Sequence, residues 1–183
     1  TVSESVTYLK KVIGKYYESS QVTLSLGQTR SVQVQVLGEV VTPGTYTLSA
    51  LSTAFNALYA AGGISDIGTL RNIKVFRGGK QISTIDVYDF IINGNENGNI
   101  RLQDDDVIIV DSYDCLVNLR GKVKRPMFYE MKSGESLASI IKYSGGFTGD
   151  AYTKNVRLIR KSGHEYSIHT VYDTDMSSFS LLD

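Results

Sequence analysis

A duplication constrains this chain more than any other feature. The segment 34–63, VQVLGEVVTPGTYTLSALSTAFNALYAAGG, returns as segment 117–146, VNLRGKVKRPMFYEMKSGESLASIIKYSGG, at a constant offset of 83 residues and without a gap. Identical turn and cap residues at this offset are Gly38 and Gly121, Pro43 and Pro126, Gly62 and Gly145, and Gly63 and Gly146. Such a period indicates one supersecondary unit that is used twice, so the chain must fold as two tandem copies.

Each copy begins as a strand, a tight turn, a second strand and a short helix. Alternating valines at 32, 34 and 36 predict a half-buried strand. Pro43 and Gly44 predict the turn, because proline fixes φ and glycine tolerates positive φ. We expect Ser49 or Ser52 to cap the helix, which should end at Gly62.

The rest of the first copy reads as a hairpin and a buried strand. Residues 73–75 and 82–87 flank the turn at 77–80, which predicts a β-hairpin. Residues 88–92 suit one helical turn, and 107–110 predict a buried strand. The order strand, hairpin, strand, helix, hairpin and strand is a β-grasp arrangement, so we expect an α+β fold with a small mixed sheet and one packed helix in each copy.

The leader and the end of the chain differ from the repeat. Helical spacing of apolar residues predicts a helix over 4–17, and alternation predicts a strand over 22–26 that forms a hairpin with 32–36. In the second copy we expect one inserted hairpin residue, after which Val171 matches Val87 at an offset of 84.

The segment Phe179-Ser180-Leu181-Leu182-Asp183 resembles Ile100-Arg101-Leu102-Gln103-Asp104. In the first copy a turn and a last strand follow. We therefore expect the second copy to lack that last strand and the chain to be a fragment of a longer protein. The expected domains are a helix-strand leader at 1–30, a first module at 31–112, and a truncated second module at 113–183.

Composition excludes some classes of function. Lys and Arg number 19, as do Asp and Glu, so the formal net charge is zero and gives no basic surplus for nucleic acid. The single cysteine, Cys115, rules out an internal disulfide framework. No apolar run in the sequence approaches the roughly 20 residues that a membrane-spanning helix needs.

Several of these motifs together carry a family resemblance. They are Gly38-Glu39-Val40 with Pro43-Gly44-Thr45-Tyr46, Ala61-Gly62-Gly63, Arg71-Asn72-Ile73 with Arg77, and Leu102 followed by Asp104-Asp105-Asp106. In combination they resemble an SLBB (soluble-ligand-binding β-grasp) domain. Gly121-Lys122-Val123, Arg125-Pro126 and Tyr143 to Gly146 resemble a second one. Asp105 departs from the family pattern, which usually has glycine there, and Met127 replaces the glycine that would follow Pro126.

Tandem SLBB copies are similar to the Wza-like polysaccharide biosynthesis and export proteins of Gram-negative outer membranes. This resemblance implies periplasmic modules that stack as rings around an export conduit, as parts of a membrane-associated homo-oligomer. The implied partners are polysaccharide and neighbouring subunits. The alternative is a module that binds a soluble glycan or small ligand without forming a conduit.

No residue pattern indicates an enzyme, a metal site or a cofactor. Asp104, Asp105 and Asp106 lack the spacing of a calcium loop, and we expect a solvated turn. His164 and His169 lie five apart, so a zinc site would need further ligands. Cys115 has no third group to orient a nucleophile, and we expect a small buried apolar residue.

The densest basic cluster comprises Arg120, Lys122, Lys124 and Arg125. We expect Lys122 and Lys124 to share a strand face. The cluster could contact an acidic polysaccharide or a neighbouring subunit, or it could be a solvated face whose lysines protect a sheet edge. Twelve tyrosines suggest sugar stacking, although Tyr46 and Tyr129 also suit hairpin packing.

Overall fold

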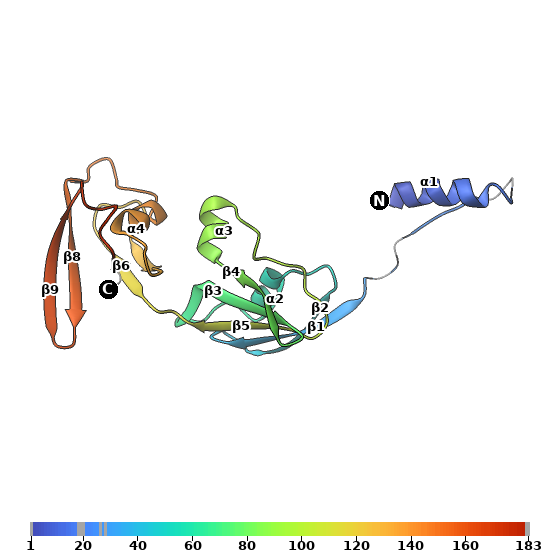
Figure 1. Cartoon of the computed structure of the whole chain (residues 1–183), viewed down its shortest axis with the longest axis horizontal. Coiled ribbons are helices and arrows are strands. Elements are labelled where there is room, and N and C mark those ends of the chain that lie inside the picture. Colours follow the sequence, from blue (N-terminus) through green and yellow to red (C-terminus); the bar gives the residue numbers. More distant parts are fainter. Residues whose placement is uncertain (1, 18–20, 26, 28, 182–183) are drawn as a thin grey trace.

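The chain forms three parts in a row: a leader helix and two β-grasp modules (Figure 1). The computed structural model describes residues 2–17, 21–25, 27 and 29–181. The first module contains β1 to β5 with α2 and α3, and the second contains β6 to β9 with α4. The mixed α+β fold that the repeat predicts is confirmed.

The leader contains one helix, α1 (Val2–Ile13), and the described residues between it and β1, namely 14–17, 21–25, 27 and 29–30, pair with no strand. The helix predicted over 4–17 is confirmed, although it ends at Ile13. The strand predicted over 22–26 is wrong for the described residues 21–25, which form no strand and no hairpin with β1. Leu26 lies outside the described residues. Alternation alone does not make a strand, because a strand also needs a neighbour to pair with.

The first module is built on a sheet of five strands in the order β2-β1-β5-β3-β4. The central strand, β5, runs parallel to β1 and antiparallel to β3, while β1–β2 and β3–β4 are antiparallel pairs. The helix predicted over 88–92 is confirmed as α3. The bounds are β1 (Ser31–Gly38), β2 (Gly44–Ser49), α2 (Ala54–Ala60), β3 (Gly68–Arg77), β4 (Lys80–Ile85), α3 (Val87–Asn93) and β5 (Asp106–Ser112).

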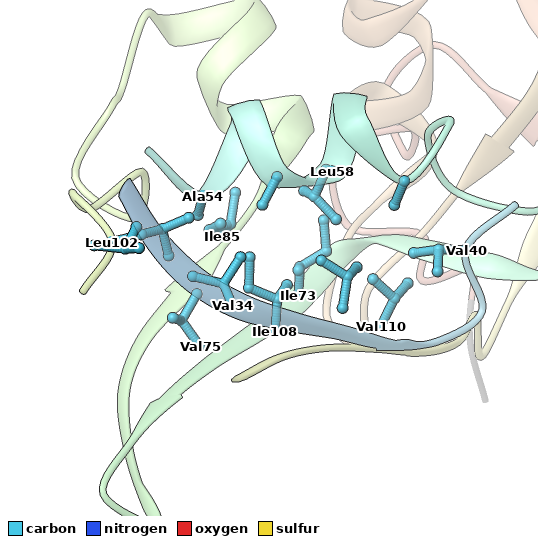
Figure 2. Packing of buried hydrophobic residues seen from close by; sticks show 14 residues of the cluster. Val34, Val40, Ala54, Leu58, Ile73, Val75, Ile85, Leu102, Ile108 and Val110 are labelled. Atoms are coloured by element: carbon cyan, nitrogen blue, oxygen red, sulfur yellow. The ribbon is translucent and has the colours of Figure 1, made fainter. Parts of the chain in front are cut away.

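The core of the first module lies between α2 and one face of this sheet. Figure 2 shows Ala54 and Leu58 of α2 above Val34, Ile73 and Ile108 of three neighbouring strands. Each of these three strand residues is fully buried. The small side chain of Ala54 lets the helix approach the sheet closely, as the alanines of this segment predict.

Two local predictions about turns and caps need correction. The N-cap of α2 is Thr53, whose backbone N–H donates to the side chain of Asn56 at 2.8 Å; neither Ser49 nor Ser52 holds this place. Gly44 begins β2 and is not among the positive-φ glycines. The left-handed conformation expected at Gly62 is confirmed, and positive φ also occurs at the other turn and cap glycines, namely Gly38, Gly63, Gly121, Gly145 and Gly146.

The second module repeats two local features of the first, while its described strands form two separate pairs. The β6–β7 pair places Val117 opposite Tyr129, as β1–β2 places Val34 opposite Tyr46. The bridge between Ser136 and Ser180 repeats the bridge between Thr53 and Arg101, which confirms the resemblance expected for the last described residues. The bounds are β6 (Leu116–Leu119), β7 (Met127–Glu130), α4 (Leu137–Tyr143), β8 (Asn155–Ser162) and β9 (Glu165–Tyr172).

The hairpin of the second module is longer than the sequence alignment predicts. Val171 pairs with Val156 across β8–β9, as Ile85 pairs with Ile73 across β3–β4, so the insertion is three residues rather than one. Val171 therefore occupies the place of Ile85, and its predicted match with Val87 is wrong. The buried side of the hairpin decides the register, because Ile85 and Val171 both face a core.

The aspartate turn before β5 is not wholly solvated. Asp105 has a φ of 63°, in the left-handed region, which accounts for the glycine that the family pattern has there. Asp106 is fully buried and accepts two hydrogen bonds from Arg77, each at 2.8 Å. The prediction of a solvated turn is thus wrong for Asp106, which is half of a bidentate ion pair.

Candidate functional site: the junction between the modules

The two modules meet at a polar junction rather than at an apolar seam. β5 leads into β6 through residues 113–115 only, and the start of β3 packs against β7. This short connection brings Thr69, Leu70 and Arg71 of the first module to Glu130 and Glu135 of the second. We call these five residues, with Asp86, Tyr88, Lys132 and Tyr143, the junction cluster.

Arg71 is the centre of the junction cluster. Its Nε donates to Asp86 at 2.9 Å, and its two terminal nitrogens donate to the Glu135 carboxylate at 3.1 and 2.8 Å. It also donates to the backbone carbonyl of Glu130 at 3.1 Å. The residue is only 5% exposed. One guanidinium thus holds a carboxylate from each module, a geometry that suits its planar fork of donors.

Glu130 of the second module makes a further set of hydrogen bonds to the first module. Its carboxylate accepts from the hydroxyl of Thr69 and from the backbone N–H of Leu70, the latter at 2.7 Å. Its own backbone N–H donates to the hydroxyl of Tyr88 at 3.0 Å. Glu130 is 6% exposed and Thr69 is 3% exposed. A buried carboxylate with this many donors is satisfied, so these contacts fix the distance between β3 and β7.

Aromatic rings cover the guanidinium. The Arg71 Cζ lies 4.5 Å from the ring centroid of Tyr88 and 5.4 Å from that of Tyr143, and the two rings meet edge to face at 5.5 Å. These are attractive cation–π and aromatic geometries. They help to shield the guanidinium of Arg71, and hydrogen bonds are stronger in such a buried setting than in water.

Burial and hydrogen bonding shift the pKa values of the junction cluster in opposite ways. Burial alone would raise the pKa of Asp86 and of Glu135. The bonds from Lys132 and Arg71 to Asp86, and from Arg71 and Tyr143 to Glu135, outweigh burial and hold both pKa values below the ordinary range. Burial and the bond to Glu135 raise the pKa of Tyr143 to about 12. At neutral pH the carboxylates of Asp86 and Glu135 are therefore charged, and the Tyr143 hydroxyl keeps its proton.

Two pockets lie beside the junction cluster. One, of about 320 Å³, is polar and is lined by Arg71, Asp86, Lys132 and Glu135 among others. The other, of about 200 Å³, is more apolar and includes Leu70 and Arg125. The polar pocket has the size of a small ligand, yet its charged side chains already pair with one another.

The predicted basic cluster lies next to the junction, in the loop between β6 and β7. Its four side chains are exposed, and Lys122 pairs with Asp150 at 2.6 Å. Lys122 and Lys124 do not share a strand face, because neither belongs to a strand. Arg125 donates to the carbonyl of Tyr143 at 3.1 Å and so joins the edge of the second module's core. A contact of this cluster with polysaccharide or a subunit stays a prediction.

The other singled-out residues have structural surroundings. Cys115 is half-buried against the core of the second module rather than buried as predicted, and burial raises the pKa of its thiol. His169 packs its ring near Phe179, at 6.2 Å between centroids. Among the described residues, no group of three or more His, Cys, Asp and Glu could hold a metal ion. In the same part of the chain, no helix has the length and apolar character to cross a membrane.

Sequence reasoning missed the junction cluster. Arg71 stood out only as part of a motif, and neither Glu130 nor Glu135 drew attention. A signal was present in the repeat itself: the residues 83 positions earlier are Thr47 and Ser52, so both carboxylates are specific to the second copy. Residues that differ in charge between the two copies indicate a surface that makes contacts in only one of the copies.

Comparisons with known proteins agree with this architecture. A family model of the SLBB domain matches residues 32–110, and a second SLBB domain model matches residues 116–169. Together the two matched stretches cover more than two thirds of the chain.

Named relatives are export proteins. The chain is 30% identical over 167 residues to the EPS I polysaccharide export outer membrane protein EpsA of Ralstonia nicotianae, covering 88% of this chain and 44% of that protein. It is 32% identical over 123 residues to the polysialic acid transport protein KpsD of Escherichia coli, covering 67% of this chain and 22% of that protein. The matched region is thus less than half of each relative. From its two matched domains, the chain belongs to the SLBB-domain family and carries two SLBB domains in tandem.

Proposed function

We propose that this chain is a periplasmic, non-catalytic segment of an outer-membrane polysaccharide export protein and that it acts in the assembly of the export conduit. The observation that carries the proposal is the tandem SLBB match to relatives whose names denote polysaccharide export and transport. We place the modules at 31–112 and 113–183, after a leader at 1–30.

The junction cluster supports a role in assembly. A conduit made of stacked modules needs a fixed angle between neighbours, because small rotations add up along a stack. The buried guanidinium of Arg71 and the carboxylate of Glu130 make directional hydrogen bonds between the modules. A flexible linker would instead make relative domain motion the default. The segment therefore acts as a rigid spacer within a full-length, membrane-associated homo-oligomer.

Gene deletion and complementation test the export role. Deleting the full-length gene should abolish surface capsule or exopolysaccharide, and the wild-type gene should restore it. Normal surface polysaccharide in the deletion strain would contradict the export role. Full-length particles that remain monomeric in detergent would contradict the oligomeric conduit, even if export were lost.

A second candidate function is binding of a soluble glycan without a conduit role. The exposed basic cluster at Arg120, Lys122, Lys124 and Arg125 favours it, as do exposed tyrosines such as Tyr152, 72% exposed, and Tyr166, 66% exposed. A glycan panel would test it: binding should be lost in Lys122→Glu and retained in Lys154→Glu, a matched exposed lysine that also pairs with an aspartate. No binding at millimolar glycan would reject this function.

A further inference from the structure

A cavity with a mostly apolar lining lies beside the junction cluster. Its volume is about 200 Å³, and both modules contribute to it. The first module supplies the start of β3 and one side of α3, while the second supplies β7 with its preceding loop and the end of α4. The lining residues are Leu70, Tyr88, Ile91, Ile92, Arg125, Met127, Tyr129 and Tyr143. We call this cavity the apolar pocket.

The apolar pocket exposes large apolar side chains to solvent. Ile91 is 68% exposed and Met127 is 53% exposed, although both lie beside half-buried residues such as Leu70. Covering such side chains with an apolar group is favourable for the same reason that a core forms. Ligand sites are also typically apolar clefts with a few polar groups, and they often lie where domains meet. The pocket therefore favours a ligand with an apolar body.

Arg125 supplies the charge of the apolar pocket, since the other described residues of the lining are uncharged at neutral pH. Its side chain donates to the backbone carbonyl of Tyr143 at 3.1 Å, and the hydroxyl of Tyr129 donates to the Arg125 carbonyl at 2.7 Å. These two bonds hold the residue in place. Within the part of the chain that the structure describes, no carboxylate forms an ion pair with Arg125. Its guanidinium thus presents an unbalanced positive charge and further N–H donors beside an apolar cavity.

The repeat shows that this charge belongs to the second copy alone. Arg125 stands where the first copy has Thr42, at the offset of 83 residues. The hydroxyl of Tyr46 donates to the carbonyl of Thr42, as the hydroxyl of Tyr129 donates to the carbonyl of Arg125. This backbone contact is thus common to both copies. The cation is present only in the second copy, where the neighbouring module completes the pocket.

We propose that the apolar pocket binds a small free carboxylate with an alkyl or aryl body. The carboxylate lies against the guanidinium of Arg125, whose planar fork of donors matches two carboxylate oxygens. The body covers Leu70, Ile91 and Met127. One negative charge balances the one positive charge of the lining, whereas a phosphate monoester brings a second negative charge that the described lining does not pair.

A ligand rich in hydroxyl groups fits the apolar pocket less well. The polar atoms of the lining, apart from Arg125, are the hydroxyls of Tyr88, Tyr129 and Tyr143. Each of these hydroxyls already has a hydrogen-bond partner in the protein. A sugar would lose its bonds to water here and find few replacements, which is unfavourable. The pocket is therefore a site apart from any contact with polysaccharide.

A ligand in the apolar pocket also stabilises the contact between the modules. Leu70 and Tyr88 belong both to the pocket and to the junction cluster. The N–H of Leu70 donates to the Glu130 carboxylate, and the N–H of Glu130 donates to the Tyr88 hydroxyl. Because the ligand touches both modules, it binds the closed junction and not the open one. Occupancy therefore slows the amide exchange of Leu70 and Glu130 and makes the junction more rigid.

The test titrates the 183-residue chain with octanoate, octanol and octylammonium, three probes that share one apolar body and differ in charge. Half-saturation is read from the NMR shifts of the Ile91 and Met127 amides at physiological salt. Octanoate should bind about threefold more tightly than octanol, as expected for one exposed charge pair, and octylammonium should bind least. At octanoate about ten times above half-saturation, the exchange of the Leu70 and Glu130 amides should slow about tenfold.

Charge reversal at Arg125 supplies the decisive variant. Arg125→Glu should reverse the order of the probes, so that octylammonium binds most tightly, and a misfolded pocket cannot produce such a reversal. Arg120→Glu is the matched control, because this residue is exposed in the same loop but does not line the pocket.

Three results would overturn the proposal. They are equal half-saturation by the three probes, an unchanged order in Arg125→Glu, and unchanged exchange of the Leu70 and Glu130 amides at saturating octanoate. Binding to anionic vesicles that octanoate does not displace would also overturn it, because this result would assign the exposed apolar side chains to a lipid surface.

Discussion

Replacing Arg71 with methionine should uncouple the modules at neutral pH. The substitution keeps most of the side-chain volume but leaves the carboxylates of Asp86 and Glu135 without their shared guanidinium. Removing one partner of a buried ion pair costs about 3–5 kcal/mol, and because Lys132 still pairs with Asp86 we expect about 3 kcal/mol. At about 1.4 kcal/mol per factor of ten, the junction should open about 100-fold more often.

Amide hydrogen exchange at the junction measures this opening. The N–H of Leu70 donates to the Glu130 carboxylate, and the N–H of Glu130 donates to the Tyr88 hydroxyl, so both report directly on contact between the modules. Their exchange should accelerate about 100-fold in Arg71→Met, while amides of the first core, such as that of Val34, should change far less. At about pH 4 the difference should shrink, because protonation neutralises the two carboxylates that have lost the Arg71 guanidinium.

The repeat offers a matched control at the equivalent position. Lys154 lies 83 residues after Arg71 and pairs with Asp173 at 3.1 Å, but its side chain is 69% exposed and that of Asp173 is 43% exposed. Lys154→Met should leave junction exchange within about twofold of wild type, as expected for a solvated ion pair. If Arg71→Met also stayed within that range, the claim that Arg71 holds the modules together would be refuted.

Three further predictions follow from other contacts. The free energy of unfolding should fall as pH drops below about 4. Asp86 and Glu135 have lower pKa values in the folded chain than in the unfolded chain, so their contribution to stability is complete above the unfolded-state pKa values and is lost as pH falls through the folded-state pKa values. Urea denaturation at pH 7 and pH 3 checks this. Asp106→Asn should cost the first module about 3 kcal/mol, measured by urea denaturation, because it weakens a fully buried bidentate pair. Gly38→Ala should lower the melting temperature far more than Gly121→Ala does, since only the former meets a neighbouring strand; equal shifts would contradict this account.

The repeat made much of the fold predictable. Tight turns and helix ends restrict which residues can stand there, and glycine tolerates a positive φ. The matches of Gly38 with Gly121 and of Gly62 with Gly145 therefore predicted turns and helix ends in both modules from the sequence. Alternation in β1 likewise predicted which face of that strand is buried. Turns, helix ends and strand alternation depend on residues that are close together in the sequence, so the sequence alone is enough to predict them.

Features that depend on distant partners were not predictable. Residues 22–26 alternate like a strand, but alternation does not reveal whether a partner exists. The hairpin register failed because Val171 matches Val87 by identity, while burial makes it the counterpart of Ile85. The junction cluster joins Arg71 to Glu130 and Glu135, about 60 positions further along the chain, and no local pattern links them.

The order of strands also has a mechanical consequence. β1 opens the first module and β5 closes it, and the two lie side by side in parallel over the register from Val34 to Gly38. Tension that enters at Ser31 and leaves at Ser112 pulls these neighbours lengthwise past each other. The ladder bonds between them lie across the direction of pull and share the load, instead of breaking one after another. The first module is therefore arranged to transmit force along the chain without unravelling.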